Sequence, residues 1–126
     1  MENKNMITNI QPTILLVGND STLSYLLGRF AERSGYLLTV ISESLSIKEI
    51  ESINPTVIIF ISTELLATRQ TLVVELANFD APIMVCSSVV DQARARELGA
   101  DYCLLHPLIY DDFQKAMMDA NISKRD

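Results

Sequence analysis

The chain has 126 residues, of which 48% are hydrophobic, and 16 acidic against 10 basic side chains give it a formal net charge of −6. This length suits one domain with a sizeable core, and the composition excludes an intrinsically disordered chain. Because phosphate binding needs clustered Lys and Arg, the acidic balance disfavours a nucleic-acid partner. No apolar run approaches the ~20 residues that span a bilayer, and no signal peptide is visible, so we expect a cytoplasmic protein without a membrane partner.

The first part of the chain predicts two strands, each followed by a helix. Residues 1–12 are polar and mixed in character, and we expect them to form a flexible N-terminal tail. A buried strand over Thr13–Val17 precedes a tight turn and a helix in which Leu and Phe recur at helical spacing, until Gly35 stops it. A second strand over Leu37–Ile41 leads into a shorter helix over Ser46–Ile53.

The unbroken apolar run within PTVIIFIS (55–62) is the centre of the predicted fold. A strand with one face in water would alternate polar and apolar residues, and this run does not alternate. It therefore predicts a central strand covered on both faces, as in a parallel sheet with helices above and below it. In such sheets ligands gather outside the carboxyl ends of the strands. Here that end carries Ile61 and Ser62, which offer no acid, base or metal ligand.

The rest of the chain continues the alternation of strands and helices, which implies an α/β domain with a parallel sheet, right-handed crossovers and helices on both faces. We expect one domain over residues 13–121 and a C-terminal tail over residues 122–126. The remaining predicted elements are a helix over Glu64–Ala77, a strand over Ile83–Cys86, a helix over 91–98, a strand over Tyr102–Leu105 and a helix over 110–121.

The two cysteines, Cys86 and Cys103, both lie within apolar, strand-like runs. We expect them to be buried free thiols in a reducing cytoplasm. Because they lack a Cys-x-x-Cys spacing, they do not predict a metal site.

Four short stretches, with the spacing between them, carry a resemblance to a known family. They are ILLVGND (14–20), PTVIIFIS (55–62), APIMVCSS (81–88) and ELGADYCLLHPL (97–108). In this order they resemble the receiver domain of bacterial two-component response regulators, over about residues 12–121. The resemblance implies a flavodoxin-like (βα)5 fold with strand order 2-1-3-4-5, and a cis peptide bond between His106 and Pro107.

Receiver domains transfer a phosphoryl group, and that chemistry needs four kinds of side chain. A carboxylate accepts the phosphoryl group, acids in the first turn hold Mg²⁺, and a hydroxyl and a lysine bind the phosphoryl oxygens. The resemblance places the metal-binding acids at Gly18 and Asn19, the phosphoacceptor at Ile61, the hydroxyl at Ser87 and the lysine at His106. Of these, Ser87 alone keeps its residue type. Because an alkyl side chain cannot be phosphorylated, the resemblance implies a degenerate pseudo-receiver that lacks a phosphoacceptor and the family's Mg²⁺ site.

The other polar side chains near this edge have structural roles in our interpretation. Asp20 or Ser21 can cap the following helix, and Asp20 beside Asn19 would make a poor Mg²⁺ site. Glu64 suits the positive end of a helix dipole and should be exposed. His106, the single histidine of the chain, lacks the orienting carboxylate and nucleophile of a catalytic set. We therefore expect no metal, no cofactor and no enzymatic activity.

These observations predict an atypical, phosphorylation-independent signalling domain that acts by binding another protein. Losing the acids together with the acceptor removes a cluster of like charges that is costly without a metal. The alternative is a sensor, in which the emptied pocket binds a small molecule or anion. Its candidate ligand-binding residues are Gly18, Asn19, Ser87 and His106.

The expected binding surface is the face that receiver domains use for partners or for a second copy. It is formed by the helix over 91–98, the strand over 102–105 and the helix over 110–121, and it suits a protein partner or a homodimer. The family's switch aromatic falls at Cys103, while Tyr102 should face the other side of the strand. The surface should draw on Val89, Val90, Arg94, Glu97, Asp101, Tyr102, Ile109 and Tyr110.

Overall fold

A computed structural model describes residues 11–42 and 46–125 of the chain, and within them the strands form one parallel sheet. The order of the strands is β2-β1-β3-β4-β5, which confirms the predicted flavodoxin-like arrangement. The strands are β1 (Thr13–Val17), β2 (Leu37–Ile41), β3 (Val57–Phe60), β4 (Ile83–Ser87) and β5 (Tyr102–Leu105).

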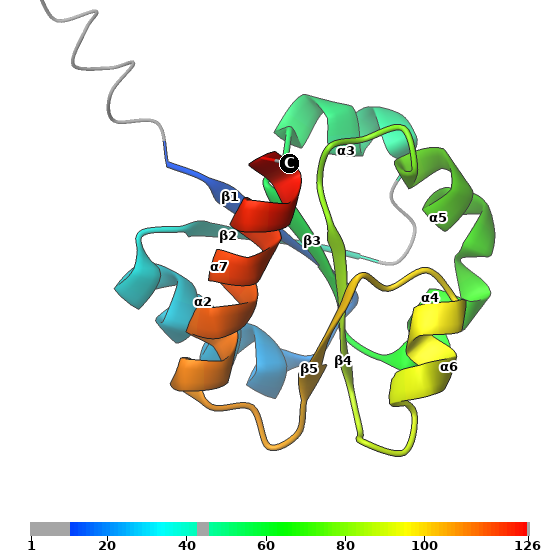
Figure 1. Cartoon of the computed structure of the whole chain (residues 1–126). Coiled ribbons are helices and arrows are strands. Elements are labelled where there is room, and N and C mark those ends of the chain that lie inside the picture. Colours follow the sequence, from blue (N-terminus) through cyan, green and yellow to red (C-terminus); the bar gives the residue numbers. More distant parts are fainter. Residues whose placement is uncertain (1–10, 43–45, 126) are drawn as a thin grey trace, which may run out of the picture.

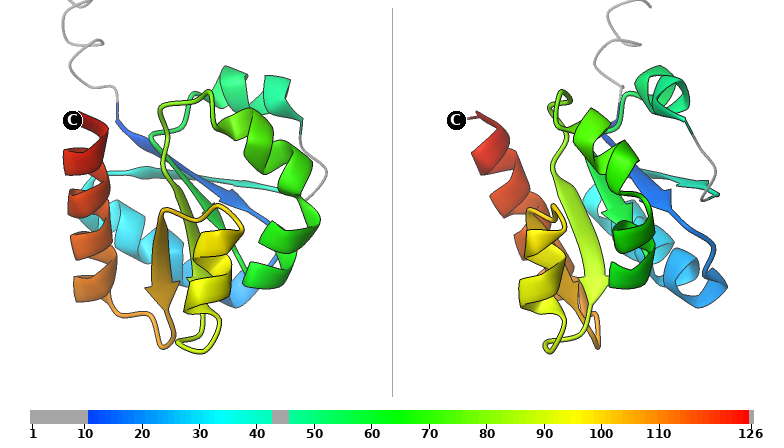
Figure 2. Two further views of the ribbon diagram at one scale, coloured as in Figure 1. Left: turned by 45° about the vertical axis from the view of Figure 1, so that its right-hand side comes forward. Right: turned by 90° about the vertical axis from the view of Figure 1, so that its right-hand side faces the viewer.

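Helices cover both faces of this sheet (Figure 1). Helices α2 and α7 lie on one face, and the remaining helices lie on the other, as the two further views also show (Figure 2). The helices are α2 (Ser21–Ser34), α3 (Ile47–Ile53), α4 (Thr63–Thr68), α5 (Gln70–Leu76), α6 (Gln92–Glu97) and α7 (Tyr110–Arg125). No helix in the described part of the chain is long and apolar enough to cross a membrane.

The central strand β3 is buried along its whole length, as the apolar run predicted. Val57 and Ile59 pack with side chains of α2 and α7, whereas Ile58 and Phe60 pack into the core on the other face. All four side chains are at most 1% exposed. This two-sided burial explains why a strand without alternating polarity is stable in water.

The first two helices begin and end where local sequence signals predict. The Asp20 carboxylate accepts a hydrogen bond of 3.0 Å from the Leu23 amide, so Asp20 caps α2. Gly35 ends the helix in the left-handed conformation, with φ at 82°. Ser46 and Glu49 form a reciprocal capping box at the start of α3.

The helix predicted over Glu64–Ala77 is in fact two helices, α4 and α5, and this prediction was wrong. The chain leaves helical geometry at Arg69, where φ is −116° and ψ is 36°. The Gln70 side chain donates to the carbonyl oxygens of Leu66 and Leu98, both at 2.9 Å. The bond to Leu98 links the start of α5 to the end of α6, a long-range contact that helical periodicity does not reveal.

Two predicted elements near the ends of the chain extend further in the structure than the sequence indicated. Residues 122–125, predicted as part of a C-terminal tail, continue α7 in the structure. Residues 1–10 of the predicted N-terminal tail lie outside the described residues. The carbonyl of Pro12, also predicted as part of that tail, accepts a hydrogen bond of 2.9 Å from the Leu37 amide. The pairing of β1 with β2 therefore extends one residue before Thr13. The exact domain boundaries remain a prediction.

Candidate functional site

The carboxyl ends of four strands bring the predicted pocket positions to one edge of the sheet. Gly18 follows β1, Ile61 follows β3, Ser87 ends β4 and His106 follows β5. The Ile61 amide donates to the Val17 carbonyl at 3.1 Å, and the His106 amide donates to the Ser87 carbonyl at 3.2 Å. The fold thus brings together the positions that correspond, by the resemblance to receiver domains, to the phosphorylation pocket.

The Ile61 side chain fills the space above Gly18. A Cβ atom added at Gly18 would lie 2.5 Å from Ile61 Cγ1 and 2.6 Å from Ile61 Cδ1, closer than real Cβ contacts allow. Gly18 also has φ at 120°, a conformation that other residues rarely adopt. Ile61 is half-buried and packs against the cores on both faces of the sheet. An isoleucine therefore occupies the volume into which a larger side chain at position 18 would extend.

The polar residues of the first turn point to a structural role. Asn19 and Asp20 are exposed, and Asp20 caps α2 as predicted. Glu64, at the start of α4, is exposed, also as predicted. Within residues 11–42 and 46–125, no group of three or more His, Cys, Asp or Glu side chains could hold a metal ion.

Two hydroxyl groups are buried beside this edge without a hydrogen-bond partner among the described residues. They are Ser87 Oγ, in a residue that is 4% exposed, and Thr63 Oγ1, in a residue that is 1% exposed. The sequence pointed to Ser87 but missed Thr63, although Thr63 lies two positions after Ile61 at the start of a helix. A buried, unpaired hydroxyl costs about 1–3 kcal/mol, so its presence calls for an explanation.

The two cysteines differ in their surroundings. Cys86 is a buried free thiol, as expected, whereas Cys103 is a free thiol that is only half-buried, which corrects the prediction for that residue. Burial raises the pKa of Cys86 to about 12, and the negative charge of Asp20 adds to this shift. Cys103 faces the core under α6, and Tyr102 packs on the opposite face of the sheet, as the alternation of the strand predicted.

The face formed by α6, β5 and α7 has an apolar end beside the carboxyl edge. Val89 and Val90, in the loop before α6, are 67% and 90% exposed, and Ile109, in the loop before α7, is 51% exposed. Arg94 and Glu97 are exposed on α6. Asp101, in the turn before β5, is exposed as well, so six of the eight predicted surface residues are exposed.

Tyr110 does not belong to that open face, because it bridges α7 and α2. Its hydroxyl lies 2.9 Å from Ser34 Oγ, and its ring centre lies 5.5 Å from that of Phe30 and 3.8 Å from the Arg33 guanidinium. Tyr102 is likewise half-buried, and its hydroxyl donates to the Asp119 carbonyl at 3.1 Å. Both rings hold α7 in place. The sequence alone does not distinguish a tyrosine with this role from one that binds a partner.

Solved structures of response-regulator receiver domains share this architecture. A putative response regulator from Chloroflexus aurantiacus is 18% identical, with a TM-score of 0.73, over 88% of this chain and 98% of that one. The signal receiver domain of a putative Luxo repressor protein from Vibrio parahaemolyticus is 16% identical, with a TM-score of 0.69, over 92% of this chain and 94% of that one.

A longer protein contains the same unit. NtrX from Brucella abortus, solved in complex with ADP, is 15% identical, with a TM-score of 0.75, and the match covers 92% of this chain but 27% of that chain. No protein-family model and no curated protein matches the sequence. The chain thus has the fold of these receiver domains, and this confirms the resemblance at the level of architecture.

The raised pKa of Cys86 makes the stability of the fold depend on alkaline pH. The Cys86 thiol has a pKa of about 12 in the folded state, whereas an ordinary thiol, as in the unfolded chain, has a pKa of about 8.5. The contribution of this thiol to the free energy of unfolding is therefore complete below about pH 8.5 and is lost as the pH rises toward about 12. We expect the free energy of unfolding to fall by up to about 1.4 kcal/mol per pH unit in this window. Urea unfolding at a series of pH values measures the effect. The Cys86→Ala variant should lack this component, and equal pH slopes for the two proteins would contradict the assignment.

Proposed function

We propose that this chain is a phosphorylation-independent, receiver-like signalling domain that works by binding another protein. The observation that carries this proposal is the contact between Ile61 and Gly18. The side chain at the position of the phosphoacceptor cannot accept a phosphoryl group, and it also occupies the space above the position of a metal-binding acid. The pocket is therefore filled rather than merely altered at one residue.

A filled pocket removes the electrostatic reason for a phosphorylation switch. In receiver domains, Mg²⁺ and a phosphoryl group bring strong charges to this edge, and those charges bias the conformation. Here Ile61 joins the cores of both faces by apolar packing, so the carboxyl end of β3 is stabilised without any ion. We infer a domain that stays near one conformation, in which the binding surface is always available.

The proposed interface is the open part of the face formed by α6, β5 and α7. Val90 and Ile109 supply exposed apolar contact area, and Arg94 and Glu97 supply charges of both signs at its side. Apolar groups flanked by charges of both signs are typical of interfaces that combine affinity with orientation. Both a different protein and a second copy of this chain fit that description.

A second candidate function is a small-molecule or anion sensor. The unpaired hydroxyls of Ser87 and Thr63 favour it, because a ligand oxygen could satisfy them. The position of Ile61 speaks against it, since a ligand at this edge would have to displace that side chain from Gly18. A bound ligand would raise the melting temperature in step with its concentration.

Incubation with acetyl phosphate and Mg²⁺ should leave the mass of the protein unchanged. Position 61 offers no carboxylate, and Gly18 and Asn19 offer no acids for the metal. Intact-mass spectrometry measures the result, with a receiver domain that retains its aspartate treated in parallel. We expect Ile61→Asp to remain unmodified as well, because one acid does not rebuild the metal site. A gain of one phosphoryl group by the unaltered chain would refute phosphorylation independence.

Charge placed on the proposed interface should abolish binding without unfolding the domain. We expect Val90→Asp, and separately Arg94→Glu, to reduce partner capture or self-association by about tenfold or more, as for central interface residues. The reversal is limited to Arg94 because Arg96 donates a hydrogen bond to the Asp101 carbonyl. Light scattering measures self-association, and affinity capture from the source organism measures partner binding.

Val74→Asp is the matched control for Val90→Asp. Val74 is 71% exposed and lies on α5, away from this face, so it adds the same charge to a different surface. All three variants should melt at nearly the unaltered temperature, since exposed substitutions cost little. Binding that survives Val90→Asp but is lost in Val74→Asp would place the interface at α5 instead.

A further inference from the structure

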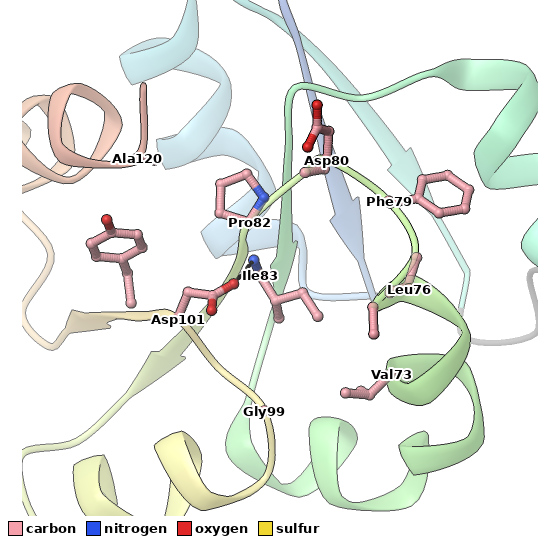
Figure 3. A pocket seen from close by; sticks show the side chains of 12 residues that line it. Val73, Leu76, Phe79, Asp80, Pro82, Ile83, Gly99, Asp101 and Ala120 are labelled. Carbon is pink, nitrogen blue, oxygen red and sulfur yellow. Dashed lines mark hydrogen bonds between the residues drawn. The ribbon is translucent and has the colours of Figure 1, made fainter. Parts of the chain in front are cut away.

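A cavity of about 610 Å³ lies at the opposite edge of the sheet from Ile61, where β4 and β5 begin. Its walls come from the end of α5, the loop into β4, the turn between α6 and β5, and α7 (Figure 3). We call it the acidic groove. The described residues that line it are Val73, Leu76, Ala77, Phe79, Asp80, Ala81, Pro82, Ile83, Gly99, Asp101, Tyr102 and Ala120.

Most of the residues that line the acidic groove are apolar, and polar atoms contribute nearly half of its exposed surface. Val73 and Leu76 lie on the wall formed by α5, and Pro82 and Ile83 form the start of β4 between that wall and Asp101 (Figure 3). Phe79 and Pro82 are half-buried rather than fully covered, so apolar surface remains open to solvent here. A volume of this size falls within the range of sites that accept a side chain or a small ligand.

Hydrogen bonds fix the walls of the groove. Asp101 pairs twice with Ile83: its amide donates to the Ile83 carbonyl at 2.7 Å, and its carboxylate accepts from the Ile83 amide at 2.8 Å. The turn beside Asp101 is linked to α5 by the hydrogen bond from the Gln70 side chain to the Leu98 carbonyl. The turn also packs closely on α5, since a Cβ atom added at Gly99 would lie 2.7 Å from Val73 Cγ1. A groove held in this way needs little ordering when it binds, which favours affinity.

The charge at the rim of the groove is negative. Asp80 and Asp101 are exposed acids in the lining. None of the described lining residues is Lys, Arg or His. The guanidinium of Arg96 donates a hydrogen bond to the main-chain carbonyl of Asp101 at 3.2 Å. The carboxylate of Asp101 accepts its hydrogen bond from the Ile83 amide instead. An apolar floor below an acidic rim complements an apolar side chain with a cation next to it.

We propose that the acidic groove binds a peptide segment of a partner protein that presents an apolar side chain beside Lys or Arg. The apolar side chain enters between α5 and the start of β4, and the cation lies near Asp80. This site is separate from the face of α6, β5 and α7, so it goes beyond the proposed function and gives the domain a second contact. A chain with two binding surfaces at opposite edges can hold two proteins together.

The test is selection of a random heptapeptide library displayed on phage against the whole chain. Enriched peptides are then synthesised, and their dissociation constants are measured by fluorescence anisotropy. We expect enrichment of an apolar residue next to Lys or Arg. Asp80→Lys should weaken the selected peptides by about threefold to tenfold, as expected for reversal of an exposed charge. Ala77→Trp, a bulky change at an exposed lining position, should weaken them at least as much by filling the groove.

Matched controls separate the groove from the rest of the surface. Glu64→Lys makes the same change in net charge at the other edge, and Ala93→Trp adds the same bulk on α6, at an exposed position outside the lining. Both should bind the selected peptides as the unaltered chain does. The proposal is overturned if no peptide is enriched, if the enriched peptides lack Lys and Arg, or if Asp80→Lys and Ala77→Trp bind normally. Val90→Asp should not affect these peptides, so the outcome is independent of the interface near α6.

Discussion

The packing of Ile61 over Gly18 is the constraint on which the character of the carboxyl edge depends. A larger residue at position 18 would need both a strained backbone and the space that Ile61 occupies, so the two positions suit each other. A carboxylate at position 61 would in turn face apolar neighbours without a cation, which is unfavourable. An acid at position 18 would therefore also need a change at position 61. At the edge where receiver domains perform phosphoryl chemistry, this chain has an isoleucine that packs against the hydrophobic cores of both faces.

The two edges of the sheet present different surfaces. At the carboxyl edge, the loops expose Val90 and Ile109 beside the half-buried Ile61. At the other edge, Asp80 and Asp101 line the acidic groove together with apolar residues. This distribution supports the proposed role in protein binding, because each surface combines apolar area with charges that can orient a partner. The core that contains β3, buried on both faces, lies between the two surfaces.

Much of this fold follows from local sequence. The unbroken run that contains β3 predicts a two-sided sheet, and the capping residue Asp20 and the stop at Gly35 mark the bounds of α2. The break at Arg69 could not be predicted, because the Gln70 bond to Leu98 joins residues that are distant in sequence. The site was predicted unevenly for the same reason. Residue types alone showed that the acids are missing. The spacing of residues carries no signal for three other features: the contact of Ile61 with Gly18, the burial of Thr63 and the bridging role of Tyr110.

A double-mutant cycle on Gly18 and Ile61 tests the central claim most directly. Urea unfolding of Gly18→Ala, Ile61→Ala and the double variant gives their coupling free energy, and Gly35→Ala replaces Gly18→Ala in a control cycle. Gly35 also has a positive φ, but nothing lies within 4 Å of a Cβ atom added there. We expect Ile61→Ala to relieve the cost of Gly18→Ala by about 1–3 kcal/mol and to leave the cost of Gly35→Ala unchanged. Additive effects in both cycles would show that Ile61 does not fill the pocket.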